Sequence, residues 1–396
     1  MAQFDPAAAT AAYLATLSPA AHAKAIAYTH GGEWLMLWGT LVTVAVCVII
    51  LRSGVLARLK GAIEGKRPRP WLVAFVLSLA FLVLSWLLQL PWASYANWGR
   101  ERSYGFSDQP WPSWLADQAK VFAVTLPVLA IFYALLYALV RRAPRTWPLW
   151  AGALSAAFIV FGAWAQPAVV EPMLNHYAPA PPGPVRDLVT AMGKANGVPT
   201  EKIYVYNGSK QSNRYTANVA GLFGTARVAL SDTMFRQGAD LAEVRGVVGH
   251  EMGHYVLRHQ LWGALFSAVM TVIGGFCLMG LFPLARGWMG ARSVESLADP
   301  AGLPVVWAVI AILNLVATPI FNTETRMQEA AADSFSLEHA HEPDGLAKAL
   351  VKTIAYRASS PSDLEEFIFY DHPSVEHRVR KAMDWKAAHP NAVPEG

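Results

Sequence analysis

The chain has 396 residues, of which 54% are apolar and only 15% are charged, and its mean hydropathy is +0.29. Soluble domains carry about 25% charged residues, so this balance indicates a membrane protein and excludes an ordinary soluble enzyme. The net charge of +4 is spread over loops, without the interleaved basic and aromatic residues of a nucleic-acid surface. We therefore expect the lipid bilayer, and no nucleic acid, as a partner.

The N-terminal segment, residues 1–32, carries Asp5 near its start, has no basic region, and is interrupted by Pro19. This pattern is not that of a signal peptide. It predicts two short helices before the first membrane span, and a soluble cap is the alternative.

Six apolar segments of about the length needed to cross the hydrocarbon follow along the chain. Tryptophans gather at their ends, as expected for side chains at the level of the lipid headgroups. We therefore predict six transmembrane helices, at residues 34–51, 71–93, 121–140, 147–166, 261–284 and 303–321.

The long polar interval between the fourth and fifth spans opens with a proline-rich turn at residues 177–184. A helix is predicted at 185–196, and short strands are predicted at 202–206, 215–220 and 226–231, where β-branched and aromatic residues lie between glycine-rich turns. Helical patterns after the sixth span cover 324–338, 344–357 and 375–388. We divide the chain into an N-terminal segment (1–32), spans one to four (33–170), a metalloprotease part (171–260), spans five and six (261–321) and a C-terminal part (322–396).

The central motif is Val247–Tyr255, in which His250 and His254 are four residues apart and Glu251 follows the first histidine. On a helix, both imidazoles lie on one face and can bind the same metal ion. Two neutral imidazoles and one carboxylate form a common zinc ligand set that leaves a fourth position for water. Glu251 stands where it can take a proton from that water. The motif predicts a zinc hydrolase, and a helix with two solvated histidines is the alternative.

The third ligand should be a carboxylate at the same depth in the membrane. His254 precedes the fifth span by seven residues, and Glu329 follows the sixth by eight. Because a helix rises 1.5 Å per residue, both lie about 10–12 Å from the ends of an antiparallel pair of spans. Asp333, one turn after Glu329, is placed to accept a hydrogen bond from a ligating histidine, and Arg326 is placed to steady either carboxylate.

Other histidines and acids fit the metal site less well. Glu324, Glu338, His339 and His341 lack a supporting partner at helical spacing, so we interpret them as solvated helix faces and a loop. His259, five residues after His254, should point off the metal face. We treat His22, His30, His176 and His389 as surface or interfacial residues.

Taken together, several stretches resemble the type I CAAX prenyl proteases, integral-membrane zinc metalloendopeptidases that cleave after a prenylated C-terminal cysteine, and their bacterial relatives. The resemblance covers most of the chain from about residue 70 and agrees in order and in spacing. It rests on Leu90–Tyr95, Ser103–Phe106, Ser209–Ser212, Arg227–Thr233, His250–His254, Arg326–Asp333 and Tyr370–Pro373 with Arg378.

The resemblance implies a mostly α-helical membrane protein with a gluzincin-like zinc metalloprotease domain that contains a small β-sheet. One Zn²⁺ per chain would be bound by His250, His254 and Glu329. Glu251 would be the general base, and Asp333 would support the ligands. The eukaryotic relatives have seven spans around a large intramembrane chamber where we count six, so the chamber is expected to be smaller or differently closed.

The resemblance also implies contacts to substrate. His372 would hold the substrate backbone or stabilise the oxyanion, although by itself it is a turn histidine before a proline. Arg378 is assigned to substrate in the same way. Relatives carry Asn-Ala-Tyr on the strand that pairs with substrate, where this chain has Thr216-Ala217-Asn218. Asn218 lies two residues from the expected position and faces the same side of a strand, so Thr216 and Asn218 are the candidate substrate contacts.

The expected reaction is hydrolysis of a peptide bond, in which zinc polarises the scissile carbonyl and Glu251 takes a proton from the attacking water. Substrate would lie extended beside residues 214–220. The substrate would be a membrane-associated peptide or protein, with or without a prenyl group. A protease for membrane-protein quality control is therefore an alternative function. The alternative of another class is a receptor or transporter with structural zinc, which would have no use for Glu251.

Two arguments give opposite orientations in the membrane. The loops joining spans one and two, three and four, and five and six are rich in Lys and Arg, and the positive-inside rule places such loops in the cytoplasm. The catalytic side would then face outward, whereas the resemblance places it in the cytosol. We follow the resemblance, in the inner membrane of a bacterial cell or the endoplasmic reticulum membrane of a eukaryotic one.

Overall fold

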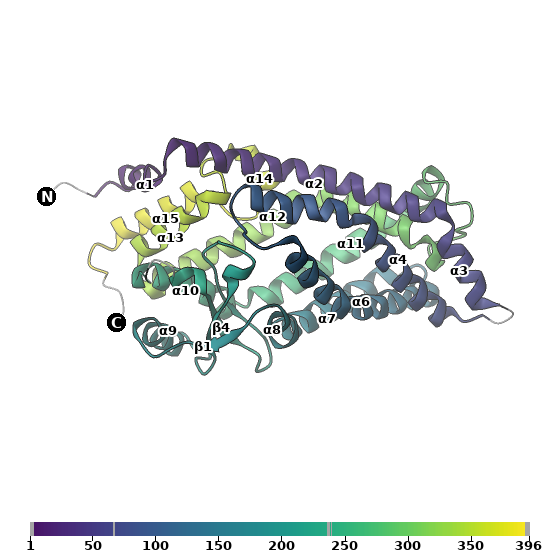
Figure 1. The fold of residues 1–396 in the computed structure, drawn as a ribbon, viewed down its shortest axis with the longest axis horizontal. Coiled ribbons are helices and arrows are strands. Elements are labelled where there is room, and N and C mark those ends of the chain that lie inside the picture. Colours follow the sequence, from purple (N-terminus) through teal and green to yellow (C-terminus); the bar gives the residue numbers. More distant parts are fainter. Residues whose placement is uncertain (1–3, 66–67, 236–237, 239, 393–396) are drawn as a thin grey trace.

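The computed structural model describes residues 4–392 except 66–67, 236–237 and 239. It is mostly helical, with one small sheet (Figure 1). The helices are α1 Pro6–Leu14, α2 Pro19–Ser53, α3 Val55–Glu64, α4 Pro70–Ala93, α5 Arg100–Ser103, α6 Trp111–Arg142, α7 Trp147–Ala165, α8 Glu171–Leu174, α9 Pro184–Ala195, α10 Leu241–Val256, α11 His259–Trp288, α12 Leu303–Ala340, α13 Pro343–Thr353, α14 Asp363–Phe369 and α15 Val375–Ala388. The strands are β1 Tyr177–Pro179, β2 Ile203–Tyr206, β3 Ala217–Ala220 and β4 Arg227–Ser231.

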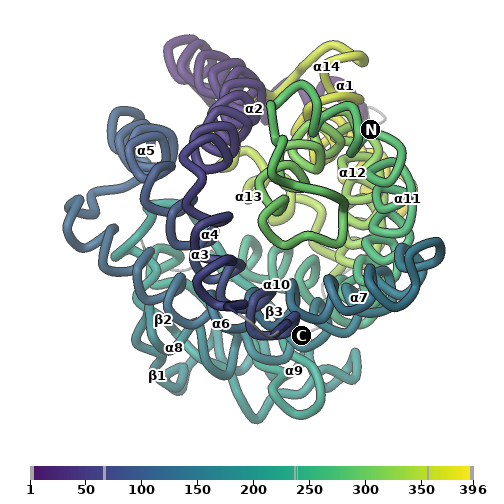
Figure 2. Tube along the Cα trace, turned by 90° about the vertical axis from the view of Figure 1, so that its right-hand side faces the viewer, coloured from purple at the N-terminus to yellow at the C-terminus, as the bar shows by residue number. Residues whose placement is uncertain are grey.

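The membrane part is a closed ring of helices. Within the described residues, six helices are long and apolar enough to cross a bilayer, namely α2, α4, α6, α7, α11 and α12, which confirms the six predicted spans. Each packs against the next in that order, and α12 packs again on α2. Figure 2 shows the ring from its end. Two of these helices, α2 and α4, begin at a proline, which suits the first turn because its fixed φ is already helical and its missing N–H costs no bond there.

The two ends of the ring differ. At the end near α3, an apolar core that includes Leu77, Phe81, Met289 and Leu303 joins the helices and the 289–302 loop. At the other end lie the sheet, α9 and α10 (Figure 1). A polar cavity of about 760 Å³ lies there, lined by side chains of the spans, the sheet and the loops between them. The sheet, α9 and α10 therefore cover the end of the ring that holds polar groups.

The sheet has the strand order β1-β2-β4-β3, in which β2 and β4 are parallel and the other two pairs are antiparallel. Side chains alternate between its faces. Ile203, Val219, Val228 and Leu230 belong to the buried core that the sheet shares with α9 and α10. Asn218, on the opposite face, lines the polar cavity. β3 therefore lies at an edge of the sheet, between α10 and the cavity.

The structure also differs from the sequence prediction in its element boundaries. β1 lies in the segment predicted to be a turn, and α14 was not predicted. α12 is one helix through the predicted sixth span and the segment after it, and α2 runs unbroken past residue 32. The division of the chain into five parts stays a proposal. One break was not expected: α10 ends at Val256, so the zinc helix does not continue straight into α11.

Candidate active site

Helices α10 and α12 pack closely because glycines line their contact. A Cβ atom built on Gly249 would lie 2.8 Å from the Ser336 hydroxyl oxygen, and one on Gly253 would lie 3.1 Å from the Ala332 Cα atom. Both distances are shorter than an ordinary van der Waals contact, so a larger side chain would push the helices apart. The close approach carries the imidazoles of α10 to the carboxylates of α12.

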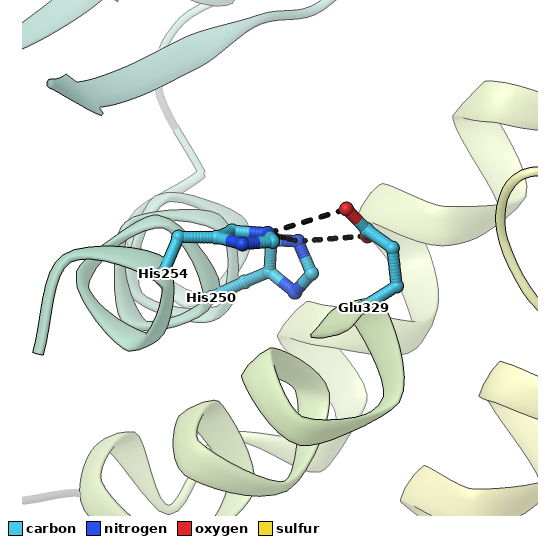
Figure 3. Close-up of side chains that lie close together, drawn as sticks. All are labelled: His250, His254 and Glu329. Atoms are coloured by element: carbon cyan, nitrogen blue, oxygen red, sulfur yellow. Dashed lines mark hydrogen bonds and ion pairs between the residues drawn. The ribbon is translucent and has the colours of Figure 1, made fainter. Parts of the chain in front are cut away.

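His250, His254 and Glu329 point toward one another across this contact (Figure 3). The Nε2 atoms of the two histidines are 3.1 Å apart. Glu329 Oε2 lies 3.2 Å from His250 Nε2, and Glu329 Oε1 lies 3.3 Å from His254 Nε2. The structure thus brings together the three residues that the sequence predicts as ligands, two from their i, i+4 spacing and Glu329 from its distance to the end of the sixth span.

This set of donor atoms fits a zinc ion. The Oε2 atom of Glu329 is buried and accepts no hydrogen bond. Burial lowers the pKa of His250, but the neighbouring carboxylates of Asp333 and Glu329 outweigh it and raise the pKa of His250 to about 9. The carboxylates therefore make this point favourable for positive charge. Two imidazoles and one carboxylate are the ligand set of catalytic zinc sites, in which a water molecule takes the fourth position.

Behind the ligands, Asp333 orients His250. Asp333 is 1% exposed, and its Oδ1 lies 2.9 Å from His250 Nδ1. Arg378 donates from Nε to Oδ2 and from Nη2 to Oδ1 of Asp333, each at 2.7 Å. The prediction assigned Arg378 to substrate. The structure instead buries it behind the metal site, where it balances the buried charge of Asp333 and so fixes the ring of His250.

His259 lies off the metal face and supports the other histidine ligand from behind, a contact that the sequence does not predict. Its Nδ1 lies 2.8 Å from His254 Nδ1, and the residue is 8% exposed. The prediction assumed a straight helix from α10 into the next span. Arg258 instead adopts a φ of 57°, in the left-handed region, and this turn between α10 and α11 brings His259 back onto His254.

We expect His259→Leu to lower the affinity for zinc about 10 to 100-fold, the usual cost of losing a group that orients a ligating histidine. With Nε2 of His254 on the metal, its Nδ1 carries a proton and needs an acceptor. His259→Asn is the matched control, because its side-chain oxygen can replace the ring Nδ1, and it should keep most of the affinity. Competition for Zn²⁺ with a coloured chelator measures both variants. Equal affinities for His259→Leu and the wild type would contradict this role.

His372 reaches the site from the C-terminal part of the chain. Its Nε2 lies 3.3 Å from Glu329 Oε2, and its Nδ1 lies 2.8 Å from Asp371 Oδ1. Burial lowers the pKa of His372 below its ordinary value, and the Asp371 carboxylate opposes this shift. The structure therefore places His372 at the rim of the site, with one nitrogen held and the other facing the ligands.

Arg326 holds the segment that leads to His372, which differs from the predicted contact with a metal-site carboxylate. It donates to the carbonyl oxygen of Glu366 at 2.9 Å and to the carbonyl oxygen of Tyr370. Its role is thus to fix α14 on α12. Helical spacing alone cannot show this, because the acceptors are backbone carbonyls some forty residues further along the chain.

Glu251 is half-buried beside the two histidine ligands. Burial raises the pKa of Glu251 above its ordinary value, while the neighbouring His250 and His254 act in the opposite direction. A carboxylate with a raised pKa is a stronger base for a water proton than an exposed one. Its environment therefore suits proton transfer at the metal.

The two candidate substrate contacts have different surroundings. Thr216 is tied to the sheet, because its Oγ1 lies 3.0 Å from the Tyr206 hydroxyl oxygen. Asn218, on β3, lines the polar cavity, and its Oδ1 is buried without accepting a hydrogen bond. Asn218 is therefore the better placed of the two to bind a peptide at this edge.

Comparison with known proteins supports the resemblance over most of the chain. The profile of peptidase family M48 matches residues 179–386. The profile described as CAAX prenyl protease N-terminal, five membrane helices, matches residues 6–176. Among the described residues of that range, four helices are long and apolar enough to span a membrane.

Relatives in several kingdoms match most of the chain. An uncharacterized metalloprotease, YhfN of Bacillus subtilis, is 26% identical over 92% of this chain and 86% of its own. The human CAAX prenyl protease 1 homolog is 24% identical over 78% of this chain and 74% of its own. The crystal structure of S. mikatae Ste24p superposes with a TM-score of 0.69 at 20% identity, covering 93% of this chain and 90% of that one.

These matches confirm the predicted fold class, a multi-pass helical membrane protein with a metalloprotease domain. The M48 match covers more than half of the chain and includes all three candidate ligands. A non-catalytic receptor or transporter with structural zinc is set aside on this ground. The chain belongs to peptidase family M48 and is a membrane zinc metalloendopeptidase related to the CAAX prenyl proteases.

Proposed function

We propose that the chain hydrolyses peptide bonds of membrane-associated substrates at one catalytic zinc ion bound by His250, His254 and Glu329. The observation that carries the proposal is the meeting of these three donors beside Glu251, with a buried Glu329 oxygen that accepts no hydrogen bond. When bound, zinc lowers the pKa of a water molecule and polarises the scissile carbonyl.

The side chains around the metal each hold or move a proton. Glu251 takes a proton from the attacking water and passes it to the leaving amine. Asp371 accepts a hydrogen bond from Nδ1 of His372, so Nε2 can donate to the substrate carbonyl oxygen only when the ring is protonated; in that form His372 would stabilise the negative charge that develops there. Asp333 and His259 keep the two ligating imidazoles in the required tautomer.

The substrate would add a strand to the sheet at β3. In the described sheet, β3 pairs with β4 alone, so the backbone groups of its other edge are available. An extended peptide laid there would form main-chain hydrogen bonds, and the Asn218 carboxamide would bind its backbone. Main-chain bonds carry little sequence preference. Such a grip favours broad specificity over a dedicated recognition sequence.

We therefore expect the protein to cut a CAAX-like peptide both with and without a farnesyl group. A farnesyl chain that contacts lipid-facing helices binds equally in the ground and transition states, so its removal should raise KM more than it lowers kcat. Steady-state cleavage of the two peptides in detergent measures this split. If only the farnesylated peptide were cleaved, the proposal of broad substrate specificity would be wrong and the protein would be a dedicated CAAX protease.

We place the catalytic end on the cytoplasmic side, following the resemblance to the CAAX proteases. The basic loops lie at the opposite end, near α3, so the positive-inside rule predicts the reverse. A reporter fused after residue 396 should then be active only if it functions in the cytoplasm. Activity of a reporter that works only outside the cytoplasm would invert this orientation.

A further inference from the structure

A second cluster of metal-binding side chains lies between α2 and α14, away from the active site. It comprises His30 and Glu33, one turn apart on α2, and Glu365 on α14. One donor atom of each residue lies within 4.8 Å of the other two, as is also true of His250, His254 and Glu329. His30 Nε2 lies 3.4 Å from Glu365 Oε1. None of the motifs that predict the active site includes these residues.

The two carboxylates of this cluster are poorly satisfied. The Oε1 atoms of Glu33 and Glu365 are both closed off from solvent, and neither accepts a hydrogen bond. Over the part of the chain that the structure describes, His30 is the one basic side chain in ion-pair contact with either of them. Two carboxylates turned toward each other repel unless a proton or a cation lies between them. A proton shared by the two carboxylates, or a cation bound between them, would relieve this repulsion.

We propose that His30, Glu33 and Glu365 form a second zinc site. A shared proton would need only the two carboxylates, whereas here an imidazole nitrogen converges on the same point. One nitrogen and two carboxylate oxygens suit Zn²⁺, and the imidazole disfavours Mg²⁺ and Ca²⁺, which prefer oxygen ligands alone. The side chain of His30 is 53% exposed, which leaves room for water on the ion and lets it exchange with the solvent.

The second site would join the first spanning helix to the segment that leads to His372. This segment is already fixed on α12, where Asn322 Nδ2 donates to the carbonyl oxygen of Ile368 at 2.8 Å. Its contact with α2 includes a hydrogen bond from the Ala358 N–H to Thr29 Oγ1 at 2.8 Å. An ion bound by two residues of α2 and one of α14 would add a link of much higher strength a few residues before His372. The second site is thus a structural clamp, and its existence does not depend on the proposed substrate.

The test uses the full chain in detergent with the catalytic ligand set disabled by Glu329→Ala. After dialysis against buffered Zn²⁺, elemental analysis should give one zinc per chain for this variant, and none once Glu365→Gln is added. Asp363→Asn is the matched control, because Asp363 is an exposed acid on the same helix, and it should leave one zinc per chain. A zinc content near zero in the Glu329→Ala chain would overturn the proposal and leave the two glutamates sharing a proton.

Thermal stability gives an independent readout. Added Zn²⁺ should raise the Tm of the Glu329→Ala chain, because an ion that binds only the folded state stabilises it. The rise should disappear with Glu365→Gln and also with His30→Ala, which removes a half-exposed ligand and leaves the core intact. A zinc-dependent rise that survives both changes would place the ion elsewhere and overturn the assignment.

Discussion

Glu251→Gln is expected to abolish peptide hydrolysis and to leave the zinc content unchanged. The amide has the shape of the carboxylate but cannot take a proton from water, and the three metal-binding side chains are untouched. Loss of a general base costs roughly 10² to 10⁴-fold in rate. We therefore expect kcat/KM for a CAAX-like peptide to fall by about that factor, with elemental analysis of the same sample giving the wild-type zinc content.

The matched control for this experiment is Glu338→Gln, which removes an exposed carboxylate of α12. It should leave both activity and zinc content at the wild-type level. Wild-type activity in the Glu251→Gln chain would rule out Glu251 as the base. A parallel loss of zinc and activity would mean that the residue serves the metal site rather than the proton transfer.

Glu329→Ala is expected to remove the catalytic zinc, because two imidazoles alone are a weak site for this ion. The measurement is best made in a Glu365→Gln chain, which lacks the proposed second site. Zinc content should fall from about one per chain to near zero, and activity should fall with it. The site carboxylate also faces His372 and Arg378, so a chain that keeps its Tm shows that the loss lies in the metal and not in the fold.

Glu324→Ala is a suitable comparison, because Glu324 is another acid on the same helix, five residues before Glu329. It should keep the zinc. In the Glu365→Gln chain, retention of one zinc after Glu329→Ala, or its loss after Glu324→Ala, would contradict the proposed ligand set.

The sequence predicts those parts of the fold that depend on local patterns. The six spans follow from continuous apolar length, which the bilayer imposes on any helix that crosses it. The three longer strands follow from β-branched residues between glycine-rich turns. β1 escapes prediction because it has three residues, includes Pro179, and forms only by pairing with β2. Its stability comes from its neighbour and not from its own composition.

The sequence predicts those residues of the metal site whose positions follow from regular helical geometry. His250 and His254 are placed by their i, i+4 spacing, and Glu329 by its depth next to a membrane span. His259 could not be placed in this way, because its position depends on the left-handed backbone of a single residue, Arg258. A non-glycine residue in that conformation has no reliable sequence signal.

The two arginines show the same limit for long side chains. Arg378 and Arg326 both lie in motifs near the site, and their partners are Asp333 for the first and two backbone carbonyls for the second. A guanidinium reaches several ångströms in any direction and carries five donors, so its partner is set by the tertiary structure. The sequence identifies such residues as important without showing what they bind.

X-ray diffraction at the zinc absorption edge, from crystals of the wild-type chain grown with Zn²⁺, measures the proposed metal site most directly. We predict an anomalous peak about 2.0–2.2 Å from Nε2 of His250, Nε2 of His254 and a carboxylate oxygen of Glu329, with Glu251 beside it. A map with no peak at that point, or with the ion bound there by other side chains, would contradict the proposed catalytic site.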